Sequence, residues 1–350
     1  MTTAPRVLVC PDKFRGTLSA AQAAAAIAAG LREAGIADTV ELPLADGGEG
    51  TLDALLAARG GDERSARVVG PDGSRVAARY GVLPDGVAVV EMAQASGLAL
   101  VAGANDPLTA TTHGTGQLIA LAVEQGASAV IVGVGGSATV DGGRGALDAL
   151  GWQSPSVPIV VACDVVTPFL DAARVFGPQK GAGAAAVEEL TDRLRLLAVE
   201  LLERTGVDVR DLPGAGAAGG LAGGLAALGA TLRPGFAVVA EAVGFATALD
   251  AAAAVVTGEG RLDETSLTGK VVGEVLSAAA RLGRPSAVVA GQVAPGLQGA
   301  LPGEPEVVAL LSLARSGSDA RVRAAELATK AGGLVGARFR ANVTRWGSGP

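Results

Sequence analysis

The feature that most constrains the fold is the stretch from Ala129 to Gly145, AVIVGVGGSATVDGGRG. It begins with 130–134, a short apolar run rich in β-branched residues, of the kind that is buried on both faces of a sheet. Glycines break the run, and a helix is expected to start after Asp141, Gly142 and Gly143. A strand that opens through glycines onto a helix leaves free N–H groups and the positive helix end at the sheet edge. This favours an anion, above all phosphate, although a tight turn without a ligand has a similar sequence.

The same order of strand, polar loop and helix recurs along the chain. Residues 6–10 predict a strand, and a polar loop leads from it to a helix over 20–33. Residues 39–44 predict a second strand, and an acidic, glycine-rich loop leads from it to a helix over 52–58. Two such loops on neighbouring parallel strands would face each other across a crevice, which is the usual position of a ligand in an open α/β sheet.

Alternating apolar and polar residues over 66–92, with turn signals at Pro71-Asp72-Gly73 and Pro84-Asp85-Gly86, predict antiparallel hairpins. Further strands are predicted over 158–163, 252–256, 286–290 and 307–313, with helices over 111–125, 184–204 and 320–342 and a frayed tail at 347–350. The core of the alanine- and glycine-rich segment 213–235 predicts a closely packed helix, whereas 252–256 is expected to run into a loop at 257–263.

The repeated units predict an α/β protein of two domains with mostly parallel sheets. Because the early and late units look alike, we expect 1–65 and 252–350 to form one discontinuous Rossmann-like domain, with 66–251 inserted into it as a second α/β domain.

Composition excludes several classes of protein. Of the 350 residues, 49 % are hydrophobic and 18 % charged, which allows a large core and excludes global disorder. The net charge is −7 without a basic stripe, so we expect no nucleic-acid partner. No apolar run of about 18 residues and no long apolar core of a signal peptide is present, so we expect a cytoplasmic protein with no membrane partner. The sequence leaves the oligomeric state open, a homodimer included.

Few residues are available for histidine or cysteine chemistry. His113 is the single histidine and no nucleophile elbow surrounds a serine, which argues against a serine hydrolase. Cys10 and Cys163 lie in apolar runs and are expected to be buried spectators, so a metal would have to be held by carboxylates, as Mg²⁺ is. The pattern GAGAAG at 214–219 lacks the preceding apolar strand that a dinucleotide site requires. A nicotinamide-dependent dehydrogenase is therefore disfavoured.

The remaining candidates are charged residues in loops at the ends of predicted strands. They are Asp12, Lys13, Asp46, Glu49, Asp141, Asp164, Lys180, Glu259, Asp263 and Lys270. Phosphoryl transfer requires such an inventory: lysines and N–H groups stabilise phosphates, carboxylates hold Mg²⁺, and one carboxylate accepts the hydroxyl proton. Each residue taken singly is more often a solvated loop residue or a helix cap, and their recurrence favours the kinase hypothesis.

Six ordered blocks between residues 6 and 291 resemble signatures of the class I glycerate kinases. They are PDKFRGTLSA, LADGGEGT, GGSATVDGG, VFGPQKGA, PGAGAAGGL and VTGEGRLDETSLTGK. The resemblance implies ATP- and Mg²⁺-dependent phosphorylation of D-glycerate on a two-domain α/β fold, with the active-site cleft between the domains. It also implies 2-phosphoglycerate as the product in preference to 3-phosphoglycerate.

The chain departs from the family pattern at several positions. Val140 stands where the family usually has asparagine, and Lys13 and Arg15 take the places of a serine and a lysine. The connection over 150–158 is short. A kinase of another small hydroxy acid, or a paralogue that binds a nucleotide or an anion without turnover, therefore remains an alternative.

The loop residues and the family resemblance together indicate a set of site residues. We expect Asp46, Asp141 and Lys13 to be catalytic, with either aspartate accepting the hydroxyl proton or holding Mg²⁺. The expected substrate-binding residues are Asp12, Arg15, Thr17, Gly47, Gly48, Glu49 and Asp164. The expected phosphate- and nucleotide-binding residues are Gly135, Gly136, Ser137, Thr139, Gly142, Gly143, Lys180, Gly258, Glu259, Asp263 and Lys270.

Overall fold

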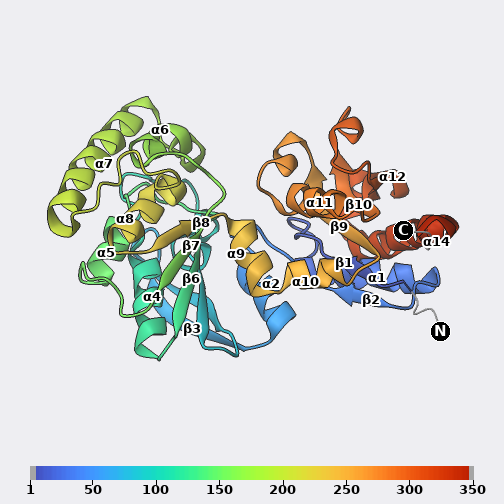
Figure 1. Ribbon diagram of the computed structural model, residues 1–350. Helices are drawn as coiled ribbons and strands as arrows, with labels where there is room; N and C mark the ends of the chain where they lie inside the picture. Colours follow the sequence, from blue (N-terminus) through green and yellow to red (C-terminus); the bar gives the residue numbers. More distant parts are fainter. Residues whose placement is uncertain (1–4, 347–350) are drawn as a thin grey trace. The chain divides into compact units, whose positions relative to one another are not determined.

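The chain folds into two compact α/β units, each built around its own sheet (Figure 1). The computed structural model describes residues 5–346, the side chains of 298 and 342–346 excepted. Within that range, unit 1 takes the residues up to Asp46, Asp53–Ala58 and those from Val239 onward, and unit 2 takes Gly47–Leu52 and Arg59–Val238. The predicted α/β class with mostly parallel sheets is confirmed. The predicted tail over 347–350 lies outside the described residues.

Unit 1 contains a five-stranded parallel sheet. Its strands, in spatial order, are β11 (Glu306–Ala309), β10 (Ser286–Val293), β9 (Ala254–Leu262), β1 (Val7–Val9) and β2 (Thr39–Glu41). All three residues of β1 are fully buried, as expected for a central parallel strand whose two faces are both covered. Because every strand runs the same way, the loops that follow them gather at one edge of the sheet.

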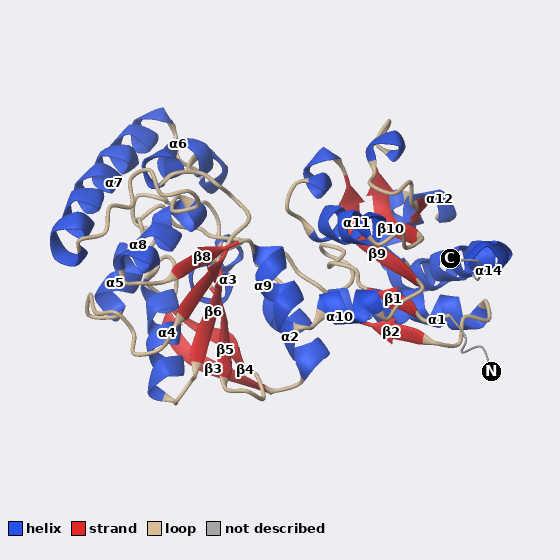
Figure 2. Cartoon of the chain, in the orientation of Figure 1, coloured by secondary structure: helices blue, strands red, loops and turns tan. Residues whose placement is uncertain are grey.

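Helices cover both faces of the unit 1 sheet (Figure 2). On one face, α1 (Ala20–Glu33) packs against α14 (Ala324–Trp346), and on the other lies α11 (Val271–Arg281). The contact of α1 with α14 depends on glycine: a Cβ at Gly30 would lie 1.8 Å from the Thr329 carbonyl oxygen. Ser19 and Gln22 form a capping box that begins α1 at the residue the sequence predicts. The shorter helices are α2 (Thr51–Arg59), α10 (Phe245–Asp250), α12 (Leu310–Leu313) and α13 (Gly317–Val322).

Unit 2 contains a six-stranded mixed sheet in sequence order. Its strands are β3 (Asp62–Val69), β4 (Arg75–Val82), β5 (Val87–Glu91), β6 (Ala129–Gly133), β7 (Ile159–Ala162) and β8 (Thr231–Arg233). The first three pair antiparallel, which confirms the predicted hairpins, and the last four pair parallel. The predicted central strand β6 therefore lies between two parallel neighbours.

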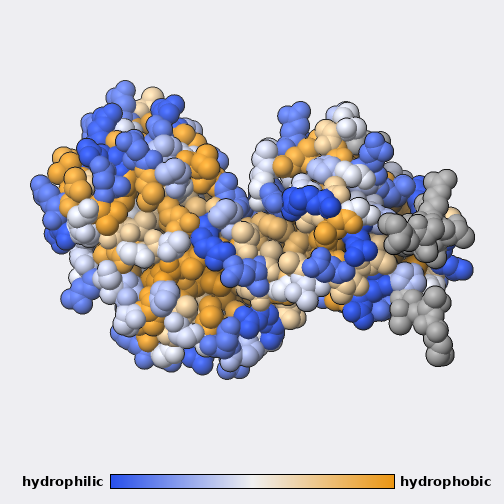
Figure 3. Space-filling view, in the orientation of Figure 1, coloured by the Kyte–Doolittle hydropathy of each residue, from blue (hydrophilic) through white to orange (hydrophobic). Residues whose placement is uncertain are grey.

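The helices of unit 2 form a layer on the sheet and a second layer outside it. The first layer includes α4 (His113–Glu124), α5 (Arg144–Ala149) and α8 (Leu221–Ala227). The long helix α7 (Ala184–Thr205) packs outside it in a separate core with α6 (Ala172–Phe176). Figure 3 shows hydrophobic atoms interspersed with hydrophilic ones over α7, where Leu196 and Val199 are exposed. The remaining helices are α3 (Ala93–Ser96) and α9 (Gly235–Ala242), with 3₁₀ turns at Leu98–Leu100, Phe169–Asp171, Pro178–Lys180, Ala217–Gly220, Glu264–Leu267 and Gln298–Ala300.

The closely packed helix expected in the core of 213–235 is α8, which begins after Gly219 and Gly220, both with positive φ. Two predicted elements were wrong in extent or type. The loop expected over 257–263 is instead the second half of β9, which continues because β10 pairs with it as far as Leu262. The strand expected over 307–313 ends at Ala309 and turns into α12. Among the described residues, no helix is both long and apolar enough to cross a membrane.

Candidate active site

The loop after β1 carries Asp12 and Lys13 at the carboxyl edge of the unit 1 sheet. The Asp12 N–H donates to the Gly258 carbonyl at 2.8 Å, which ties this loop to β9. Beyond it, Phe14 and Leu18 exchange backbone hydrogen bonds, and the Thr17 hydroxyl donates to the Phe14 carbonyl at 2.8 Å. The polar loop is therefore a closed turn with a fixed shape.

Lys13 connects the loops of two neighbouring strands. Its ammonium lies 3.6 Å from Oδ1 of Asp12 and 4.0 Å from Oδ1 of Asp46, the residue that follows β2. The Asp12 carboxylate also accepts the backbone N–H of Lys13 at 2.6 Å. The predicted crevice between these two loops thus contains one cation held between two carboxylates.

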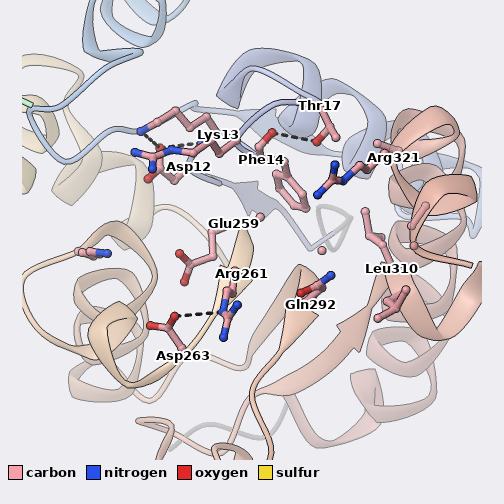
Figure 4. A pocket seen from close by; sticks show the side chains of 18 of the residues that line it. Asp12, Lys13, Phe14, Thr17, Glu259, Arg261, Asp263, Gln292, Leu310 and Arg321 are labelled. Atoms are coloured by element: carbon pink, nitrogen blue, oxygen red, sulfur yellow. Dashed lines mark hydrogen bonds and ion pairs between the residues drawn. The ribbon is translucent and has the colours of Figure 1, made fainter. Parts of the chain in front are cut away.

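Glu259 comes from the part of β9 that was expected to be a loop. The residues before and after Glu259 are glycines, because the backbone of neighbouring segments packs closely against both positions. A Cβ at Gly258 would be 2.2 Å from the Val289 carbonyl oxygen. At Gly260 a Cβ would be 3.1 Å from the Arg15 nitrogen. The Glu259 side chain extends into the space between the Asp12 loop and Asp263 (Figure 4). Its Oε1 atom is buried and has no hydrogen-bond partner among the described residues.

The carboxylates of this region titrate differently. Burial raises the pKa of Asp12 to about 6; Lys13 lowers this pKa and Asp46 raises it. Burial raises the pKa of Glu259 to about 7, against the lowering effects of a hydrogen bond from Ser266 and the charge of Lys270. A carboxyl group that titrates near neutral pH is a common feature of catalytic sites.

These groups line one cavity of about 470 Å³, which lies within unit 1 (Figure 4). Its charged wall consists of Asp12, Lys13, Arg15, Asp46, Glu259, Arg261, Asp263 and Lys270. Its other wall is more apolar and consists of Phe14, Leu310, Leu311, Ala320 and Ala324, with Gln292 and Arg321 as polar members. All of the expected site residues that belong to unit 1 line this cavity except Gly258, which lies beneath in β9.

The sequence did not identify the residues of the more apolar wall of this cavity. Gln292 belongs to the extended end of β10. Arg321 lies within the helix predicted over 320–342, which the structure divides into α13 and α14, but it was not among the expected site residues. The polar Gln292 after an apolar run, in the same pattern as Glu259 after its own run, is the signal that could have identified it.

In unit 2, the glycine loop after β6 lies against the chain segment 47–48. A Cβ at Gly135 would be 2.6 Å from the Gly48 Cα atom, and one at Gly47 would be 2.9 Å from the Ala162 carbonyl oxygen. These glycines are required by close backbone approach. Asp164 accepts the Gly235 N–H at 2.6 Å, whereas Glu49 is exposed. Gly136, Gly142 and Gly143 adopt positive φ, and Ser137 forms an isolated bridge with Gly97.

Asp141 is surrounded by donors from its own unit. Its carboxylate accepts the N–H and the hydroxyl of Thr112, both at 2.8 Å, the Gly143 N–H at 3.0 Å and the Gly145 N–H at 3.2 Å. Burial raises the pKa of Asp141, against the lowering effect of these hydrogen bonds. In this structure Asp141 holds the start of α5 in place.

Lys180 is also directed into the protein. Only 3 % of the residue is exposed, and its ammonium donates to the Thr139 carbonyl at 2.7 Å. Burial lowers the pKa of Lys180 to about 7, although the charge of Asp141 raises it. The Thr139 hydroxyl is buried without a partner among the described residues. Asn105 donates to the carbonyls of Ala138 and Lys180, so this network supports the glycine loop from below.

Comparisons with known proteins show which family has this arrangement. The model of the glycerate kinase family matches the chain over residues 7–156 and 153–339. Glycerate 2-kinase of Escherichia coli (strain K12) is 41 % identical over 325 residues, covering 82 % of this chain and 85 % of its own. Glycerate kinase of Halalkalibacterium halodurans is 39 % identical over 329 residues, covering 83 % and 87 %. A crystal structure assigned as glycerate kinase 2 from Salmonella typhimurium LT2 superposes with a TM-score of 0.83 at 35 % identity, covering 98 % of this chain and all of that one.

Proposed function

The chain belongs to the glycerate kinase family, and from this premise we propose that it transfers the γ-phosphoryl group of ATP to D-glycerate, giving 2-phosphoglycerate. Membership makes the chain a kinase, a phosphotransferase whose acceptor is an alcohol, and the family implies that it uses ATP. The acceptor, the product and the requirement for Mg²⁺ are the parts that we propose.

The observation that carries the proposal is the position of Lys13 between two carboxylates at the mouths of β1 and β2. A small hydroxy acid presents a carboxylate and hydroxyl groups, and Lys13 and Arg15 offer cations for that carboxylate in the same cavity. Charge-assisted hydrogen bonds from such cations would both hold and orient the acceptor.

The cavity residues also fit a nucleotide. A volume of about 470 Å³ is in the usual range for small-molecule sites. Lys270, whose ammonium lies 3.2 Å from the Thr265 hydroxyl, stands at the N-terminus of α11 and would contact phosphate oxygens. The wall of Leu310, Leu311 and Ala324 would lie against the apolar faces of a nucleoside.

Mg²⁺ fits if it is held mainly by phosphates and water. No group of three or more histidine, cysteine, aspartate or glutamate side chains that could hold a metal occurs in the part of the chain that the structure describes. Mg²⁺ usually takes one or two carboxylates and completes its shell with phosphates and water. We assign Asp46 as the carboxylate ligand in preference to Asp141, because the oxygens of Asp141 already accept four hydrogen bonds. When bound, the ion would neutralise charge on the transferred phosphoryl group.

The glycine loop of unit 2 keeps its proposed role in phosphate binding. Its shape is held by Asp141 and by the Lys180 network, so Gly135, Gly136 and Ser137 would offer their backbone N–H groups without rearrangement. The preference for the 2-phosphorylated product rests on the family resemblance and on the relative named glycerate 2-kinase.

The test is an ADP-release assay with D-glycerate, ATP and Mg²⁺. The site of phosphorylation follows from ³¹P–¹H coupling in the product, because the phosphate is coupled to one proton in 2-phosphoglycerate and to two in 3-phosphoglycerate. Lys13→Met should raise the KM for glycerate at least tenfold, whereas Lys330→Met, which removes an exposed lysine, should not change it. Turnover of another hydroxy acid but not of glycerate would refute the proposed acceptor, and coupling to two protons would refute the proposed product.

A further inference from the structure

We propose that Glu259 accepts the proton of the acceptor hydroxyl during phosphoryl transfer, an inference that rests on the proposed kinase function. The sequence assigned Glu259 to phosphate binding and gave the proton-accepting role to an aspartate. The positions of the side chains in the cavity reverse that assignment.

Three of the four carboxylates in the cavity wall, Asp12, Asp46 and Glu259, differ in what they contact. Asp12 accepts the Lys13 N–H at 2.6 Å and has the Lys13 ammonium at 3.6 Å, and Asp46 has the same ammonium at 4.0 Å. Both aspartates are thus engaged by the same Lys13 ammonium. Glu259 instead carries a buried oxygen, Oε1, that has no hydrogen-bond partner among the described residues. A buried acceptor without a partner is costly, and it is retained where a ligand supplies the missing donor.

The position of Glu259 is fixed by the strand. It lies in β9, opposite Ala290 of β10, and close backbone packing at Gly258 and Gly260 keeps this part of β9 in place. A carboxylate on a rigid strand can be aimed at a hydroxyl more accurately than one on a loop. Figure 4 shows the side chain directed between the Asp12–Lys13 loop and Asp263, into the charged half of the cavity.

The charges around Glu259 are balanced in a way that suits a base at neutral pH. Asp12 and Asp263 raise its pKa, Lys270 lowers it, and a hydrogen bond from Ser266 lowers it as well. Burial is the largest effect, and it brings the pKa to about 7. General bases operate best when their pKa lies near the working pH.

The proposed step conserves atoms and charge. The hydroxyl oxygen of the acceptor forms its bond to the γ-phosphorus of ATP while the bond from that phosphorus to the β,γ-bridging oxygen breaks. The electron pair of the broken bond leaves with the nucleoside diphosphate. The hydroxyl proton passes to Oε1 of Glu259, and the resulting carboxylic acid returns it to water after the product leaves.

The experiment compares Glu259→Gln with Glu264→Gln in the full-length chain. The glutamine keeps the shape of Glu259 but cannot accept the proton, so kcat should fall by about 10²- to 10⁴-fold while the KM for ATP stays within about threefold. Glu264 is an exposed carboxylate near the same site, and its variant should keep the kcat of the wild type. Thermal unfolding of both variants checks that they fold.

The pH profile separates a proton acceptor from a residue that only supports the fold. For the wild type, kcat/KM should fall about tenfold per pH unit below about pH 7, and Glu259→Asp should retain this acidic limb at a lower rate. The limb should be absent from the residual activity of Glu259→Gln. A glutamine variant with kcat within threefold of the wild type, or one that keeps the acidic limb, would overturn the inference.

A wrong choice of acceptor can be distinguished from a wrong assignment of Glu259. If the wild type phosphorylates another hydroxy acid in place of D-glycerate, the proposed acceptor is wrong and the same comparison is made on that acid, where a loss of kcat in Glu259→Gln supports the inference. A wild-type chain that transfers phosphate to no hydroxy acid would overturn both proposals.

Discussion

The buried ammonium of Lys180 should make the stability of unit 2 depend on pH in a defined direction. Burial lowers the pKa of Lys180 to about 7 in the folded chain, whereas an unfolded lysine has a pKa of about 10.4. Between these values the unfolded chain binds a proton that the folded chain does not bind. The free energy of unfolding therefore rises with pH through this window, and the stability is lost as the pH falls towards 7.

The magnitude follows from the two pKa values. With a folded pKa of about 7 and an unfolded pKa of about 10.4, this one group adds about 2 kcal/mol to the free energy of unfolding between pH 7 and pH 9. Lys180→Met keeps an unbranched stem of similar length but does not titrate. Relative to this variant, the wild type should therefore gain about 2 kcal/mol from pH 7 to pH 9.

The assay is urea unfolding followed by the fluorescence of Trp152, at pH 7, 8 and 9, in a Trp346→Phe background that leaves a single tryptophan. Trp152 belongs to unit 2, and its ring lies under the guanidinium groups of Arg144 and Arg204, at 5.1 and 4.2 Å from the ring centre. Arg195→Met removes an exposed cation of the same unit and should follow the wild type at every pH. A difference between Lys180→Met and the wild type that stays constant from pH 7 to pH 9, or that changes in the opposite direction, would refute the reasoning.

Three further predictions concern other residues. Asp46→Asn should lower kcat at least a hundredfold without changing the melting temperature, whereas Asp141→Asn should destabilise unit 2 by about 2 kcal/mol because an amide nitrogen would face backbone donors. Turnover and thermal unfolding of both variants test this, and a stability loss in Asp46→Asn with a kcat loss in Asp141→Asn would contradict it. Gly219→Ala should lower the free energy of unfolding by about 2 kcal/mol more than Gly151→Ala, because both glycines have positive φ but only a Cβ at Gly219 would meet a backbone oxygen, that of Thr139 at 2.0 Å. Equal urea midpoints for the two variants would disprove the packing argument. Chelation by EDTA should abolish turnover and Mg²⁺ should restore it, with Asp46→Asn requiring a higher Mg²⁺ concentration; a chelated enzyme that keeps its full rate would exclude the metal.

The sequence predicted the elements that depend on local patterns. The helix over 20–33 was correct at both ends because its capping box and its alanine-rich face are signals within a few residues of each other. The hairpins after residue 60 were also found, since their alternation and turn residues are local.

The errors occur where tertiary pairing decides the structure. Glu259 was placed in a loop because glycines flank it, yet β10 pairs alongside and keeps the chain extended to Leu262. The glycines signalled close backbone packing on a strand, which the local pattern does not distinguish from a turn. In the segment 213–235 the start of the helix, at Leu221, was not predictable, because Gly219 and Gly220 adopt positive φ and lie against the backbone of 139–142.

The candidate site was predictable as a set of residue types and less so as a set of roles. The loops that carry Lys13 and Asp46 were expected to face each other, and an ion pair joins these two residues. Lys180 and Asp141 look identical to exposed ligand-binding residues in the sequence, and only the structure shows their charged groups directed inward. Val140, which replaces the usual asparagine of the family, packs in an apolar core with Leu147, so a valine suits its surroundings.

The strand order of unit 1 has a consequence for biosynthesis. Strand β1, at residues 7–9, pairs with β2 on one side and with β9, which begins at Ala254, on the other. A ribosome that adds 5 to 20 residues per second needs roughly 12 to 50 s to reach β9 after it has made β1. All residues of unit 2 are made within that interval, because that unit ends at Val238. Vectorial synthesis therefore favours completion of unit 2 first. During this interval the apolar strand β1 and helix α1 lack their partners β9 and α14, so they are the segments that a nascent-chain chaperone would shield.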